Sequence, residues 1–185
     1  ATHADELCAE WGVVSDGPML APGMPAVSYG LRGLAYFQLD ISAASADLHS
    51  GTHGGAVPNP VTVLAEFIAT LHTGDGSVNL SGFYDDVTPL KAVEREALAA
   101  LEFSDDEYLK SLGAPGLAGE AGFTTLERRW ARPTLEVNGI WGGYTGEGAK
   151  TVLPACASAK LSCRLVPRQE PAAIEAALRR ACAER

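Results

Sequence analysis

The residues best suited to chemistry lie in one short loop. Residues 47–55 read Asp-Leu-His-Ser-Gly-Thr-His-Gly-Gly and come directly after a predicted strand. Glycines let a backbone approach a ligand closely, and His49 places an imidazole, which can donate or accept a proton near neutral pH, at the same point. A polar turn without a function is the alternative, and the residues alone leave both interpretations open.

Two further residues and one glycine-rich segment are also candidates for binding or catalysis. Residues 142–151 approach a strand through several glycines, but they lack the fixed Gly-Lys-[Ser/Thr] ending of a Walker loop. Arg164 interrupts a strand of small and apolar residues, where a buried guanidinium needs a carboxylate from the protein or from a ligand. Asp16 ends a short apolar run, a position at which α/β folds place metal ligands, although a turn before Gly-Pro is the alternative.

Strands and helices must position these candidates. Apolar residues alternate over 34–41, 134–140 and 155–166, which predicts strands, and they recur at helical spacing over 60–72 and 171–183, which predicts amphipathic helices. The order strand, helix, strand, strand, helix is that of an α+β fold, the ferredoxin-like βαββα(β) two-layer sandwich, with its last strand apparently missing. We interpret the missing strand as truncation of a longer protein.

The composition argues against two classes of partner. A net charge of −9 is unsuited to nucleic acid or an anionic membrane surface, since both need clustered Lys and Arg. No run approaches the ~18 apolar residues of a membrane span. The four cysteines form no CxxC pair, and Cys156 and Cys163 are expected to be reduced, packed thiols. Because no signal peptide is apparent, we expect a cytoplasmic location.

Six ordered segments of the chain resemble segments of a known family. They are 47–51 (DLHSG), 58–60 (PNP), 82–85 (GFYD), 138–144 (NGIWGGY), 150–154 (KTVLP) and 162–167 (SCRLVP). Together they resemble the lid domain of the M20 metallopeptidases, and above all that of the carnosinase-like cytosolic dipeptidases. The similarity covers nearly the whole chain, so it is far more specific than any single motif.

The resemblance implies a domain organisation, cofactors and partners. Residues 1–31 would be the end of a catalytic-domain segment and a linker, and 32–185 the lid/dimerisation domain, with an acidic helical insertion at about 82–130. Within the insertion we expect helices at about 89–101 and after Ser104. The complete enzyme would hydrolyse dipeptides with two divalent ions, zinc or manganese. Two lids would pair as a homodimer, with helix 60–72 and a neighbouring strand edge as the expected interface.

The resemblance also assigns roles to four residues. His49 matches the lid histidine that reaches into the active site of the partner subunit and stabilises the oxyanion of the tetrahedral intermediate. Thr151 and Arg164 match lid residues that hold the substrate, the Arg through the substrate's C-terminal carboxylate. Asp16, which precedes His49 by 33 residues, matches a metal ligand. His53 matches no functional position.

The remaining ligands and the general base would lie outside these 185 residues. We therefore expect the chain alone to be inactive and to bind no metal stably. A stand-alone ferredoxin-like binding or assembly module would also account for the missing ligands, but it would explain neither Asp16 nor the absent strand. The lid of a related amidohydrolase, such as an aminoacylase or carboxypeptidase, is a third interpretation, although such relatives often have Asn at the position of Thr151.

Overall fold

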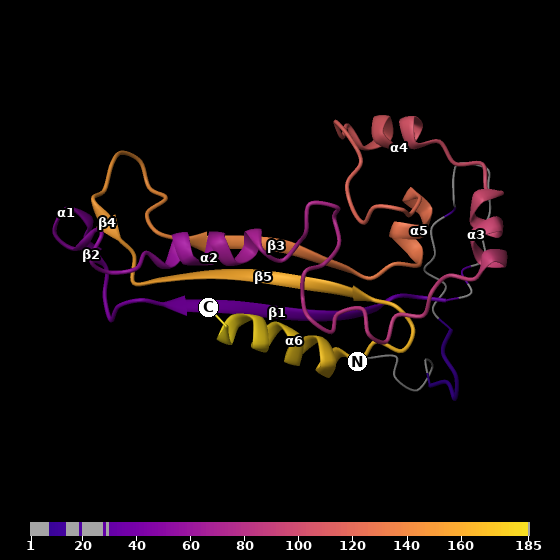
Figure 1. Ribbon diagram of the computed structural model, residues 1–185, viewed down its shortest axis with the longest axis horizontal. Coiled ribbons are helices and arrows are strands. Elements are labelled where there is room, and N and C mark those ends of the chain that lie inside the picture. The colour runs from indigo at the N-terminus through magenta and orange to yellow at the C-terminus, as the bar shows by residue number, and fades with distance from the viewer. Residues whose placement is uncertain (1–7, 14–18, 20–27, 29, 185) are drawn as a thin grey trace. The chain divides into compact units, whose positions relative to one another are not determined.

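The computed structural model describes residues 8–13, 19, 28 and 30–184. Contacts divide the chain into two units, Ala1–Leu31 and Arg32–Arg185, and the described helices and strands belong to the second unit (Figure 1). That the first unit ends a catalytic domain stays a prediction. Asp16 lies outside the described residues.

A three-stranded antiparallel sheet forms the centre of the second unit. Its strands lie in the order β1 (Gly33–Ser42), β5 (Cys156–Leu165), β3 (Thr134–Gly142). Successive side chains of a strand point to opposite faces, so the alternation in the sequence places one apolar row of each strand on the same face. This order is that of the ferredoxin-like sandwich, in which a further strand would lie along the outer edge of β1. The predicted α+β fold is confirmed.

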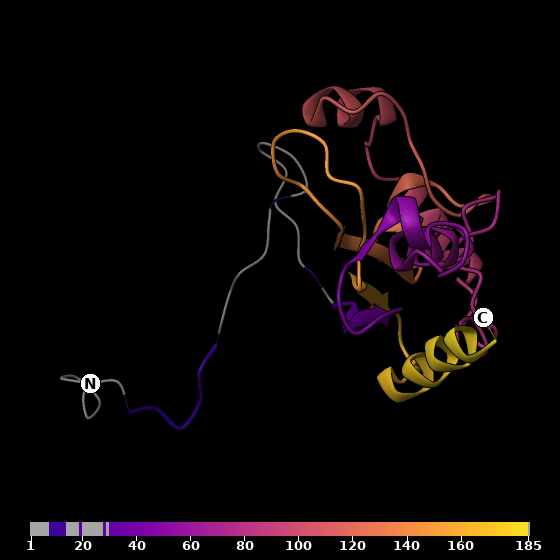
Figure 2. The ribbon, with the colours of Figure 1, turned by 90° about the vertical axis from the view of Figure 1, so that its left-hand side faces the viewer.

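Two helices cover one face of this sheet. Both α2 (Pro60–Ala69) and α6 (Pro171–Ala183) begin with Pro at a first helical position, as predicted, and Asn59 caps α2 by accepting a hydrogen bond from the Val61 N–H at 3.0 Å. Figure 2 shows the two helices on the same side of the strands. The core between helices and sheet contains Ala35, Phe67, Leu71, Leu135, Leu161, Cys163, Leu165, Ile174, Ala177 and Leu178.

A second, two-stranded sheet projects beyond the first. In it β2 (Leu48–His49) pairs with β4 (Val152–Leu153), and a single helical turn, α1 (Ser50–His53), follows β2. These three elements, which we call the tip, lie at the end of the main sheet where β5 begins (Figure 1). The sequence predicted only a polar loop here, because two-residue strands leave no alternation to detect.

The predicted helical insertion lies at the opposite end of the sheet (Figure 1). It contains α3 (Ala92–Ala99), α4 (Asp105–Leu112) and α5 (Thr125–Trp130). The predicted start of α3 near residue 89 was wrong, because Lys91 is the residue that precedes its first turn. Ser104 caps α4, as expected.

One arginine–glutamate pair joins the insertion to the residues just before β3, and a second lies within the insertion. Arg132 pairs with Glu120 at 2.6 Å, with both side chains largely buried. Arg95 pairs with Glu127 at 2.6 Å, and Glu127 itself is buried at the start of α5. The hydrogen bond from Arg95 and the one from the Thr124 backbone lower the pKa of Glu127 below its ordinary value.

Candidate functional site

The tip brings together two of the predicted site residues. His49 and Val152 are opposite each other in the β2–β4 pair, and the Ser50 N–H donates to the Thr151 carbonyl at 3.1 Å. This pairing places the Thr151 hydroxyl 3.1 Å from Nε2 of His49, although the two residues are 102 positions apart in the sequence. Both side chains are exposed, so the pair is open to a molecule that approaches from outside.

The His49 ring has two further neighbours. The Thr52 hydroxyl, one helical turn later, lies 3.4 Å from Nδ1. A Cβ atom added to Gly51 would lie 2.8 Å from Cε1 of the ring, so the imidazole occupies the space that a side chain at position 51 would fill. The glycine of the His-Ser-Gly segment is therefore required for this ring position.

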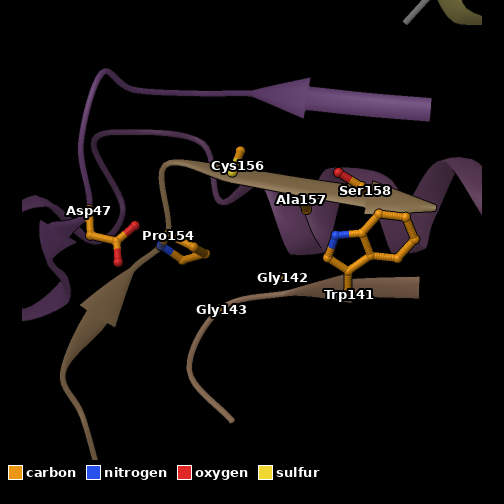
Figure 3. A pocket seen from close by; sticks show the side chains of 8 residues that line it. All are labelled: Asp47, Trp141, Gly142, Gly143, Pro154, Cys156, Ala157 and Ser158. Carbon is orange, nitrogen blue, oxygen red and sulfur yellow. The ribbon is translucent and has the colours of Figure 1, made fainter. Parts of the chain in front are cut away.

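Asp47 connects the tip to the start of β5. Its carboxylate accepts a hydrogen bond from the Ala155 N–H at 2.9 Å and so joins the residue before β2 to the residue before β5. Beside this bond lies a pocket of about 210 Å³, which also contacts Trp141, Pro154 and Cys156 (Figure 3). His49 does not line this pocket. The pocket therefore lies where the tip joins the main sheet, and not at the His49–Thr151 pair.

The two cysteines of β5 differ in their exposure to solvent. Cys163 is buried, and burial raises its pKa to about 12, so this thiol is packed and unreactive, as predicted. Cys156 is exposed at the tip end of the strand, and the prediction that it is a packed thiol was wrong. Cys156 is the first residue of β5 and points to the face opposite its neighbour Ala157, which packs against Leu64 of α2.

Arg164 lies far from the tip. It is eight residues beyond Cys156 on β5, which corresponds to about 26 Å along the strand. Its register neighbours are Leu34 and Thr134, and its side chain is exposed. Arg164 faces away from the buried row of Cys163 and Leu165, so the protein carboxylate expected for a buried arginine is not needed. Within one chain, Arg164 is not brought together with His49 and Thr151.

Arg32 is a neighbour of Arg164 that sequence reasoning missed. One Nη of Arg32 donates to the Arg132 carbonyl at 3.2 Å. Burial, and then the nearby positive charges of Arg164 and Arg129, lower the pKa of Arg32 below its ordinary value. Arg164 and Arg129 are therefore close enough to Arg32 to affect it, as is the carboxylate of Glu136, which raises the Arg32 pKa and partly offsets them. The signal in the sequence was weak, because a single arginine before a strand is common.

The described residues do not form a metal centre. Among them, no three His, Cys, Asp or Glu side chains gather closely enough to hold an ion. A di-metal site would thus need residues outside the described part of the chain, and the role of Asp16 as a ligand stays a prediction. In the same residues, no helix combines the length and apolar character that crossing a membrane requires.

Comparisons with family models and with curated proteins point to the same family. A family model described as the peptidase dimerisation domain matches residues 29–185. The chain is 36% identical to the Cys-Gly metallodipeptidase of Schizosaccharomyces pombe over 93% of its own length and 35% of the relative's. It is 32% identical to the human Beta-Ala-His dipeptidase over 88% of its own length and 32% of the relative's. The chain thus spans about a third of the length of these relatives.

Solved structures agree with this result. An M20 family metallo-carboxypeptidase from Sulfolobus solfataricus superposes with a TM-score of 0.83 and 34% identity, over 99% of this chain and 48% of that one. The dipeptidase Dug1p of Saccharomyces cerevisiae superposes with a TM-score of 0.76 and 33% identity, over 85% and 33% of the two chains. The predicted family is confirmed: this chain belongs to the peptidase dimerisation domains of the M20 metallopeptidases.

Proposed function

We propose that this chain is the lid of a homodimeric M20 dipeptidase in which each active site is built from both subunits. The observation that carries the proposal is the separation of about 26 Å along β5 between the tip end and Arg164. An extended dipeptide spans only about 7 Å. One lid therefore cannot place His49 and Arg164 on the same dipeptide, whereas two lids related by a two-fold axis can place the tip of one beside Arg164 of the other.

In this arrangement the tip supplies hydrogen-bond donors. Peptide hydrolysis passes through a tetrahedral intermediate whose oxygen becomes negative, and donors held at that oxygen lower the barrier. His49 would face this oxygen, Thr151 beside it would hold the substrate, and the Arg164 guanidinium would bind the substrate's C-terminal carboxylate. Two divalent ions, zinc or manganese, held by residues outside the described part, would polarise the scissile carbonyl.

The dimer interface is expected at α2 and the outer edge of β3. In the described residues β3 pairs with β5 alone, so its other edge offers backbone groups to a second chain. Val137, Ile140 and Trp141 on this strand are partly exposed apolar side chains. Replacing the exposed Ala65 and Ala69 of α2 by Asp should yield monomers, and an unchanged dimer mass would contradict this placement.

A dipeptide is the substrate that the names of the relatives favour, since one is a Cys-Gly metallodipeptidase and another a Beta-Ala-His dipeptidase. The free thiols agree with a cytoplasmic location. A carboxypeptidase is the second candidate, because the metallo-carboxypeptidase superposes over 99% of the chain. Assays of the full-length enzyme with free dipeptides and with longer, N-blocked peptides would separate the two activities. The 185-residue chain alone, loaded with zinc or manganese, should hydrolyse neither.

Mixing two inactive variants of the full-length enzyme tests the shared site. His49→Ala removes the donor from the partner's site, and Arg164→Ala removes the carboxylate anchor from the subunit's own site. After subunit exchange, a mixed dimer would contain one site with both residues intact, so about a quarter of the wild-type activity should return. If His49 and Arg164 served one site of one chain, the mixture would stay inactive, and the proposal would be wrong.

A further inference from the structure

Thr52 is the neighbour of His49 to which the proposed function gives no role. Its hydroxyl lies 3.4 Å from Nδ1, on the side of the ring away from Thr151, which lies 3.1 Å from Nε2. Gly51 has no side chain, and a Cβ at this position would lie 2.8 Å from Cε1, so the ring occupies space that any other residue would fill. The imidazole thus has one hydroxyl neighbour at each nitrogen.

A neutral imidazole has one N–H donor and one bare nitrogen, and a hydroxyl can serve either of them. Two arrangements are therefore available at the tip. If Thr52 donates to Nδ1, the ring proton is on Nε2, which points toward Thr151, and the Thr151 proton is left for another acceptor. If instead Thr151 donates to Nε2, neither group retains a proton for an incoming oxygen. Only the first arrangement leaves the donors that an oxyanion needs.

We propose that Thr52 is a positioning residue that donates its hydroxyl proton to Nδ1 of His49 and so keeps the ring in the Nε2–H tautomer. This inference rests on the proposed function of His49, since the tautomer matters for catalysis only if Nε2–H faces the substrate. The geometry that carries it is the ring placed between the hydroxyls of Thr52 and Thr151, in the space that Gly51 leaves open. Thr52 itself does not touch the substrate.

The tautomer can be read directly by NMR of the 185-residue chain with ¹⁵N-labelled histidines, at a pH above the ordinary imidazole range. The His49 signals are assigned by their loss in His49→Asn. We expect a bare Nδ1 and a protonated Nε2 in the wild type. In Thr52→Val the two nitrogen shifts should move toward each other, while Thr52→Ser should keep the wild-type pattern. A proton on Nδ1 in the wild type, or no change in Thr52→Val, would overturn the inference. Thr88→Val, an exposed threonine elsewhere, is the control.

Kinetics of the full-length enzyme give a second readout. Loss of one hydrogen bond that acts through the transition state should lower kcat about 2- to 10-fold in Thr52→Val, with KM unchanged, and Thr52→Ser should restore it. A purely structural role would change stability without this separation of kcat from KM. If His49→Ala left turnover intact, the proposed function would fail while the NMR result stood. If Thr52→Val left the tautomer of His49 unchanged, only this inference would fail.

Gly51→Ala tests whether the ring occupies the space that Gly51 leaves open. The added Cβ must displace the imidazole, so kcat should fall further than in Thr52→Val, and the His49 signals should shift. Gly74→Ala is the matched control, because a Cβ at that glycine meets no atom within 4 Å. Equal kcat in the two alanine variants would contradict the proposed ring position.

Discussion

The tip and the sandwich are stabilised in opposite ways. The sandwich encloses side chains such as Leu161, which is fully buried, whereas His49 and its contacts at the tip are exposed. The tip consists of a two-stranded sheet, which is marginally stable in water unless it is attached to a larger structure. The residues proposed to act on substrate are therefore carried by a weak local element, which depends on the sandwich to hold it in place.

A cavity in the core of the sandwich should have the largest effect. Leu161→Ala should lower the free energy of unfolding by about 2–5 kcal/mol, because it leaves a cavity among side chains that cannot collapse into it. Urea denaturation of the chain measures this loss. Lys160→Ala, an exposed neighbour on the same strand, should change stability by less than about 0.5 kcal/mol. Equal effects of the two changes would contradict the assignment of the core.

A change at the tip should separate activity from stability. His49→Ala in the full-length enzyme should lower turnover by about 100- to 1,000-fold, the usual cost of losing an oxyanion donor. The midpoint of urea unfolding of this variant should stay near that of the wild type, since the His49 side chain is exposed. His53→Ala, in the helical turn that follows His49, should leave turnover unchanged. A comparable loss in both variants would remove the special role of His49.

A milder change should loosen the tip without affecting the sandwich. Asp47→Ala removes the acceptor for the Ala155 N–H, a hydrogen bond worth about 0.5–1.5 kcal/mol. Amide hydrogen exchange should then become about 2- to 10-fold faster at Ser50, while the amide of Leu161 should be unaffected. Asp47→Asn keeps an acceptor and should exchange nearly as the wild type does. Faster exchange throughout the sheet would show that the two regions unfold together.

The smallest expected effect concerns pH at the insertion. Because Arg95 and the Thr124 backbone lower the pKa of Glu127, ionised Glu127 stabilises the folded state above the ordinary unfolded value of about 4.3. This contribution is lost as the pH falls through the lowered, folded pKa. Arg95→Gln should therefore be less stable than the wild type at pH 7, with the difference fading in acid. Thermal unfolding at several pH values measures it, and a difference independent of pH would contradict the pairing.

The sequence predicted the sandwich well because its signals are local. Pro60 and Pro171 mark the first turns of both helices, and the alternation of small apolar residues marks β5. The tip could not be predicted in this way, since its strands contain two residues each and their pairing joins segments about 100 positions apart. Helix α5 was also missed, although Thr124 and Glu127 form the capping box that marks its start.

The candidate site was predicted by resemblance, and its geometry only in part. That His49 and Thr151 meet follows from the β2–β4 pairing, which no sequence pattern reveals. The exposure of Arg164 was not foreseen, because the residues around it in the sequence are small and apolar. Helices cover only one face of the strand, and a polar residue on the other face stays exposed. Thr52 and Gly51 stand out only through their positions around one ring, since the Thr52 hydroxyl contacts it and Gly51 leaves space for it.

The central pairing of β1 with β5 has a consequence for how the chain folds. Its innermost register pair joins Ser42 to Cys156, so the main sheet cannot close until a loop of roughly 110 residues has brought its ends together. The cost of closing a loop grows with the logarithm of its length, so the insertion between residues 82 and 130 adds only about 0.5 kcal/mol to it. The insertion can therefore change in length with little effect on equilibrium stability. The same long-range pairing predicts slow folding, in which helices form long before the sheet on which the tip depends.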